Sequence, residues 1–108
     1  MNFKNKIAWD TETDLISINC VVPDIICHSI YDLAGQEGAV LTPEDDCLIE
    51  GIFTDPDTLI IAHNACFDLG VLSKDGTPYF DRFARLVWDA LEAHRVADTM
   101  LREMLLNL

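Results

Sequence analysis

The segment TLIIAHN, residues 58–64, is apolar over most of its length and rich in residues that favour strands. A strand that is apolar on both faces belongs in the middle of a sheet, where other elements cover it. KIAWD, residues 6–10, is a second apolar run, close to the N-terminus. We expect residues 6–10 and 59–63 to form adjacent, parallel strands at the centre of a sheet.

The remaining elements suit a mixed sheet flanked by helices. Pro43 stands at the first helical position after Thr42, and acids fill the first turn, which is the usual composition of a helix N-terminus. Periodicity predicts three more strands, at residues 24–31, 39–41 and 95–98, and helices at residues 43–53, 66–72, 79–93 and 100–108. The helix of residues 66–72 is expected to stop at residues 74–76. This order predicts an α/β fold in a single domain, residues 1–108.

Three carboxylates accompany the two central strands. Asp10 and Glu12 are two residues apart, so in a strand they project from the same face, here at the predicted strand end. Asp68 lies about one turn inside the helix that follows the other central strand. If Asp68 were only an exposed helix residue, it would need no role. If the three acids converge, they repel one another unless a cation lies between them, and hard oxygen ligands favour Mg²⁺ or Mn²⁺.

The sequence around these acids resembles a known family. WDTETDL resembles the first motif (Asp-x-Glu) of the DEDD 3′-5′ exonucleases, and HNACFD resembles the second (Asn-x-x-x-Phe/Tyr-Asp). VADTML, residues 96–101, is similar to the strand-to-helix junction in the proofreading domain of family A DNA polymerases, particularly phage enzymes. The resemblance covers nearly the whole chain, in the right order, and implies a ribonuclease H-like fold.

The resemblance also implies a function for individual residues. Asp10, Glu12 and Asp68 would be the catalytic metal ligands of a two-metal reaction on the 3′ end of single-stranded DNA. The substrate-binding residues implied by the match are Thr11, Leu15, Ile16 and Asn64. Asn64 would help to hold the strand end, and Leu15 or Ile16 would wedge against the terminal base.

The family's third motif, which supplies a fourth acid from a downstream helix, has no counterpart in the sequence. We therefore expect a C-terminally truncated exonuclease domain, with a weak second metal ion and little activity alone. A polymerase or a complementing C-terminal fragment would have to supply the missing helix. His94 and Asp98 offer a superficial His-x-x-x-Asp pattern, but Asp98 aligns better with the junction aspartate.

The charge of the chain favours a second hypothesis. It has 19 acidic and 7 basic residues and a formal net charge of −12, so its surface repels a phosphate backbone unless metal ions intervene. An inactive exonuclease remnant could instead bind a basic protein partner, as a nucleic-acid mimic or an inhibitor encoded by a mobile element does.

The four cysteines form no Cys-x-x-Cys pair, which is typical of reduced thiols in an intracellular protein. No segment has the length or the apolar character of a signal sequence or a membrane span. We therefore expect a cytoplasmic protein of a bacterial or phage-infected cell.

Overall fold

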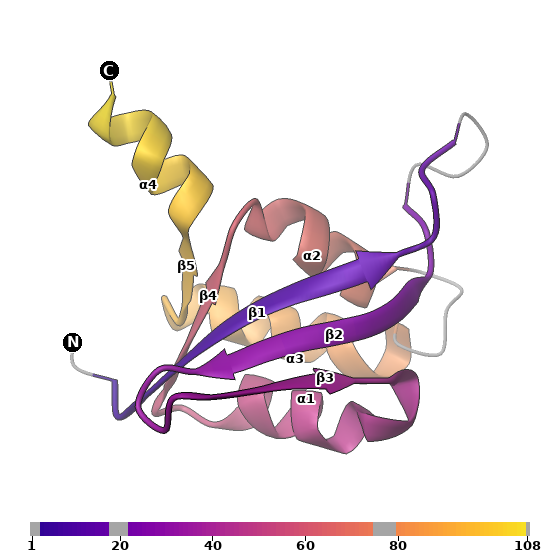
Figure 1. Cartoon of the computed structure of the whole chain (residues 1–108), viewed down its shortest axis with the longest axis horizontal. Helices are drawn as coiled ribbons and strands as arrows, with labels where there is room; N and C mark the ends of the chain where they lie inside the picture. Colours follow the sequence, from indigo (N-terminus) through magenta and orange to yellow (C-terminus); the bar gives the residue numbers. More distant parts are fainter. Residues whose placement is uncertain (1–2, 18–21, 75–79, 108) are drawn as a thin grey trace.

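The computed structural model describes residues 3–17, 22–74 and 80–107. These residues form one mixed sheet of five strands, a single 3₁₀ turn and four α-helices, in the predicted order (Figure 1). The elements are β1 (Asn5–Thr13), β2 (Ile25–Asp32), β3 (Glu37–Leu41), the 3₁₀ turn η1 (Pro43–Asp45), α1 (Asp46–Thr54), β4 (Thr58–Ala62), α2 (Ala65–Leu72), α3 (Phe80–Glu92), β5 (Val96–Asp98) and α4 (Thr99–Leu106). The predicted α/β fold with a mixed sheet is confirmed.

The strands lie in the order β3-β2-β1-β4-β5. The first three strands pair antiparallel, and the short connection between β2 and β3 is typical of such a pair. β4 pairs parallel with β1, with Ile60 opposite Ile7, and β5 pairs parallel with β4. The prediction that the two most apolar strands are parallel neighbours is therefore confirmed.

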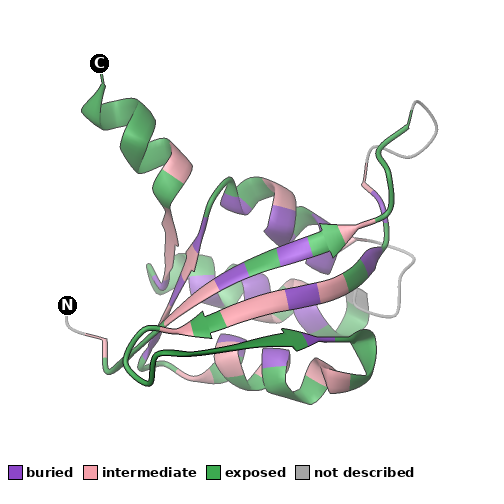
Figure 2. Ribbon diagram, viewed as in Figure 1, coloured by how far each residue is buried: buried purple, intermediate pink, exposed green. Residues whose placement is uncertain are grey.

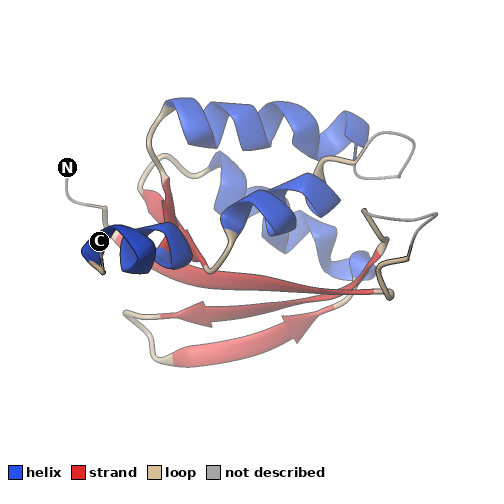
Figure 3. Ribbon diagram, turned by 90° about the horizontal axis from the view of Figure 1, so that it is seen from above, coloured by secondary structure: helices blue, strands red, loops and turns tan. Residues whose placement is uncertain are grey.

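The helices α1, α2 and α3 cover one face of the sheet and leave the other face open (Figure 3). Burial alternates along β1 in agreement with this arrangement, since the side chains of Trp9 and Thr11 are buried toward the helices. Asp10 and Glu12 are exposed and therefore lie on the open face. Within the described residues, no helix is both long and apolar enough to cross a membrane.

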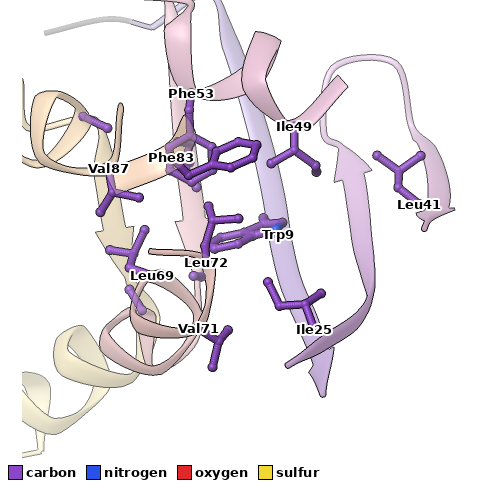
Figure 4. Packing of buried hydrophobic residues seen from close by; sticks show 14 residues of the cluster. Trp9, Ile25, Leu41, Ile49, Phe53, Leu69, Val71, Leu72, Phe83 and Val87 are labelled. Atoms are coloured by element: carbon purple, nitrogen blue, oxygen red, sulfur yellow. The ribbon is translucent and has the colours of Figure 1, made fainter. Parts of the chain in front are cut away.

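Aromatic side chains from β1, α1 and α3 form the centre of the core (Figure 4). The Trp9 and Phe53 rings meet edge to face with their centroids 5.4 Å apart, and Phe83 meets Phe53 similarly at 6.5 Å. Such pairs add to the stabilisation that comes from area burial alone. Burial is concentrated where the helices meet the sheet, whereas α4 is exposed over nearly all of its length (Figure 2).

The first strand is longer than predicted. β1 continues to Thr13, so Asp10 and Glu12 lie inside the strand and not at its end. The reason is its pairing with β2, which continues past Asp10 and places Glu12 opposite Cys27. The boundary prediction was wrong because it followed the apolar run of one strand and could not include its partner.

Other boundaries differ by smaller amounts. The helix predicted from Pro43 begins as the 3₁₀ turn, where the Thr42 backbone N–H donates to the Asp45 carboxylate at 3.0 Å. The strand predicted over residues 95–98 begins at Val96. The predicted helix start at Tyr79 and most of the predicted stop at residues 74–76 lie outside the described residues.

Candidate functional site

Asp10 and Glu12 sit on the open face of the sheet, where β2 provides their cross-strand neighbours. Asp10 lies opposite Ser29, and it lines a shallow hollow of about 530 Å³. The hollow has an apolar floor, and Tyr31 and His63 contribute polar groups to its lining. A hollow of this kind can hold part of a ligand on a face that the helices do not cover.

Asp68 is nearly buried, with 2% of its surface exposed. Its Oδ1 accepts hydrogen bonds from the Thr11 backbone N–H at 3.2 Å and from Thr11 Oγ1 at 2.6 Å. β1 pairs with β4 only as far as Ala8. Beyond that point the Thr11 backbone N–H donates to Asp68 and not to β4. Asp68 is therefore not an ordinary exposed helix residue, because α2 holds it against the edge of β1.

Burial raises the pKa of Asp68 above the ordinary aspartate value, although the two hydrogen bonds from Thr11 oppose this change. The negative charges of Asp10 and Asp98 raise this pKa further. The Asp10 charge is therefore near enough to disfavour the ionised form of Asp68. Among the described residues, no group of three or more His, Cys, Asp and Glu side chains is already arranged to hold a metal ion.

The residues implied in substrate binding lie in different environments. Thr11 is 6% exposed and faces the helices, with its hydroxyl bonded to Asp68. Leu15 and Ile16 follow β1 and are 91% and 60% exposed, so both can contact a ligand. Asn64 is exposed at the start of α2 in a left-handed conformation with φ 63°. Asparagine tolerates that conformation better than most residues.

Asp98 has a structural role that sequence patterns show only in part. Its carboxylate accepts four backbone N–H groups: Met100 at 2.9 Å and Leu101 at 3.3 Å in α4, and Asn64 at 3.0 Å and Ala65 at 2.8 Å at the start of α2. Burial alone would raise its pKa, but these four donors outweigh it and hold the pKa below the ordinary value. The two bonds to α4 are those of an ordinary helix N-cap. The bond to α2 had no sequence signal.

His28 is fully buried opposite Thr11. Trp9 Nε1 donates a hydrogen bond to His28 Nδ1 at 3.1 Å, which assigns the neutral ring with its proton on Nε2. Burial lowers the pKa of His28 to about 4. His28 is therefore a core residue whose protonation opposes folding.

Acidification should destabilise the protein through His28. Because the folded-state pKa is about 4 and the unfolded value is 6.5, stability is fully present above pH 6.5 and is lost as pH falls toward 4. We expect a loss of about 2 kcal/mol between pH 7 and pH 5. Urea unfolding at both pH values would measure it. In His28→Gln, which cannot titrate and keeps an acceptor for Trp9, the loss should be absent, and parallel pH curves for the two proteins would contradict the assignment.

No protein-family model matches this sequence, and no curated protein is significantly similar to it.

Proposed function

We propose that the chain is part of a 3′-5′ exonuclease domain of the kind found in phage-type DNA polymerases. It would hydrolyse the terminal phosphodiester at the 3′ end of single-stranded DNA, in the cytoplasm of a bacterial or phage-infected cell. The observation that carries the proposal is the bond of Asp68 to Thr11, the residue between Asp10 and Glu12, at the level where β1 extends beyond β4. Thr11 and Asp68 belong to the two segments, DTE and HNACFD, on which the resemblance rests.

The topology supports a ribonuclease H-like fold. Three antiparallel strands are followed by two that run parallel to β1, and the connections that include α1, α2 and α3 lie on one face. In this arrangement the first strand is central and carries the acids, and the second acidic motif opens the helix after the neighbouring strand. Both features are what the resemblance implies.

The donor set fits divalent cations that prefer oxygen. Asp10 and Glu12 offer exposed carboxylates on the open face of β1, and Asp68 adds a carboxylate on the helix side, bonded to Thr11 between them. These three residues would hold the metal, which when bound supplies an activated water and stabilises the leaving 3′ oxygen. Thr11 would then orient the Asp68 carboxylate, because its backbone N–H and its hydroxyl both donate to Oδ1.

Asp98 is a poor fourth ligand, because its carboxylate already accepts four backbone N–H groups. The fourth acid would have to come from residues outside this sequence or from another polypeptide, such as a polymerase or a complementing fragment. We therefore expect metal binding to be easier to detect than cleavage with this chain.

Millimolar Mn²⁺ should raise the melting temperature, because the ion binds only the folded state. The rise should disappear in Asp10→Asn and in Asp68→Asn. It should remain in Glu37→Gln, which removes one exposed charge from the edge strand β3. Differential scanning fluorimetry with and without Mn²⁺ measures the effect.

The second arm of the experiment follows a single-stranded DNA labelled at its 5′ end. We expect slow shortening from the 3′ end with Mn²⁺, and at least about a hundredfold slower shortening in Asp10→Asn. Absence of both the thermal shift and the shortening would overturn the exonuclease proposal. If both are absent and the chain binds a basic protein tightly, the acidic-remnant hypothesis is favoured.

A further inference from the structure

A groove lies between α2 and α3 and ends against β5 and the start of α4. Its volume is about 370 Å³, and its lining is mostly apolar. Trp88 and Leu91 of α3 and Leu101 of α4 line it with 64%, 38% and 50% of their surfaces exposed. Large apolar side chains gathered around one concave surface are typical of a protein interaction site.

Gly70 leaves the α2 side of this α2–α3 groove open. It lies among the lining residues, and a Cβ atom added there would meet nothing within 4 Å. Glycine is unfavourable inside a helix compared with alanine. Gly70 therefore keeps the groove open at a position where alanine would stabilise the helix more.

The apolar surface continues along α4. Leu101, Met104 and Leu105 are spaced three and four residues apart, so they share one helix face, which we call the α4 stripe. Met104 and Leu105 are 59% and 70% exposed, and α4 has no buried residue. An eight-residue helix that projects from the body and packs so little is marginal in water (Figure 1). Contact with another helix would stabilise it.

The charge of the chain decides which kind of helix fits. Glu92 is exposed on α3 beside Leu91, whereas Asp89 beside Trp88 pairs with Arg85 at 3.1 Å, and Asp98 at the end of the groove accepts four backbone N–H groups. Two copies of this chain would each carry a net charge of −12, so self-association is opposed by like-charge repulsion. The same negative charge attracts a positively charged partner.

We propose that the α2–α3 groove and the α4 stripe bind one amphipathic helix of a basic partner protein. Its apolar side chains enter the groove over Gly70 and against Trp88, and its Lys or Arg residues lie toward Glu92. This surface is on the helix side of the sheet, away from the hollow that contains Asp10. The inference therefore does not rest on the proposed nuclease activity.

Trp88 provides a direct readout of binding. The chain has two tryptophans, and Trp9 is buried in the core with 3% of its surface exposed, so changes in emission report mainly on Trp88. The probe is a synthetic peptide of about 15 residues, long enough to form a helix, with leucines at helical spacing and lysines elsewhere. We expect a saturable blue shift of the emission on titration.

Gly70→Gln should weaken peptide binding by about tenfold or more, because the new side chain occupies the groove. The protein should still fold, since this glycine is inside a helix and has free space around it. Gly51→Gln is the matched control. Gly51 lies in α1, where an added Cβ likewise meets nothing within 4 Å, and this change should leave the affinity unaltered.

Equal affinity for wild type and Gly70→Gln would overturn the groove assignment, and so would absence of any emission shift. Equal binding of a peptide in which glutamates replace the lysines would overturn the choice of a basic partner. A dimer of the protein alone in size-exclusion chromatography, abolished by Gly70→Gln, would assign the groove to a second copy and contradict the proposal.

Discussion

Arg95→Leu is expected to lower the free energy of unfolding by about 4 kcal/mol, the largest effect of any single substitution proposed for this chain. Arg95 is only 5% exposed. Its guanidinium donates to the main-chain carbonyls of Asp55 at 2.8 Å and Thr58 at 3.1 Å, and also to that of Phe53. These acceptors lie at the end of α1, in the connection after it and at the first residue of β4, so Arg95 ties a helix terminus to the sheet.

A leucine in place of Arg95 fills part of the volume but donates no hydrogen bond. Buried ion pairs can often be replaced by apolar residues without loss, because both charges disappear together. This does not apply to Arg95, since its three acceptors are backbone carbonyls, which stay in place and lose their hydrogen-bond donor. The positive charge is also favourable beside the C-terminal end of α1.

Urea unfolding of Arg95→Leu, followed by circular dichroism, measures this loss directly. Arg95→Lys should recover part of the stability, because it restores the charge without the planar fork of donors. Arg85→Leu is the control, since that side chain is 85% exposed and pairs with Asp89 one helical turn away. A loss for Arg95→Leu no larger than that of the control would show that the carbonyls find other donors.

Asp98→Ala is expected to lower the free energy of unfolding by about 3 kcal/mol. The change removes the acceptor of two N–H groups in the first turn of α4 and two at the start of α2. Hydrogen bonds to a carboxylate are stronger than neutral ones. The partial solvent exposure of Asp98 keeps the expected loss below the sum of four separate bonds.

Hydrogen exchange shows whether Asp98 joins the starts of α2 and α4 or only caps α4. In Asp98→Ala, amide protection should fall at Asn64 and Ala65 as well as at Met100 and Leu101, although the first two are distant in sequence. Asp98→Asn keeps one acceptor oxygen and should lose less stability. Protection lost in α4 but retained in α2 would mean that the bond between the two helices is dispensable, so that Asp98 does not position the helix that carries Asp68.

Much of the fold follows from local patterns. The apolar segments around Ile7 and Ile60 predicted the two central strands and their parallel pairing, and the helices α1 to α4 followed from spacing and, for α1, from Thr42 and Pro43. These signals act within a few residues, since strand alternation, helical periodicity and capping all depend on near neighbours. The acids Asp10, Glu12 and Asp68 could likewise be selected from sequence.

The tertiary structure decided where those residues point and what they contact. The pairing of β2 lengthened β1 and placed Asp10 and Glu12 on the open face, and the end of β4 at Ala62 brought Asp68 to Thr11 across 57 positions of sequence. The contacts of Asp98 with α2 and of Arg95 with the end of α1 are equally remote along the chain. Such contacts depend on strand register and helix placement together, so the sequence alone determined the elements and the candidate acids, whereas only the packed chain determined how they act on one another.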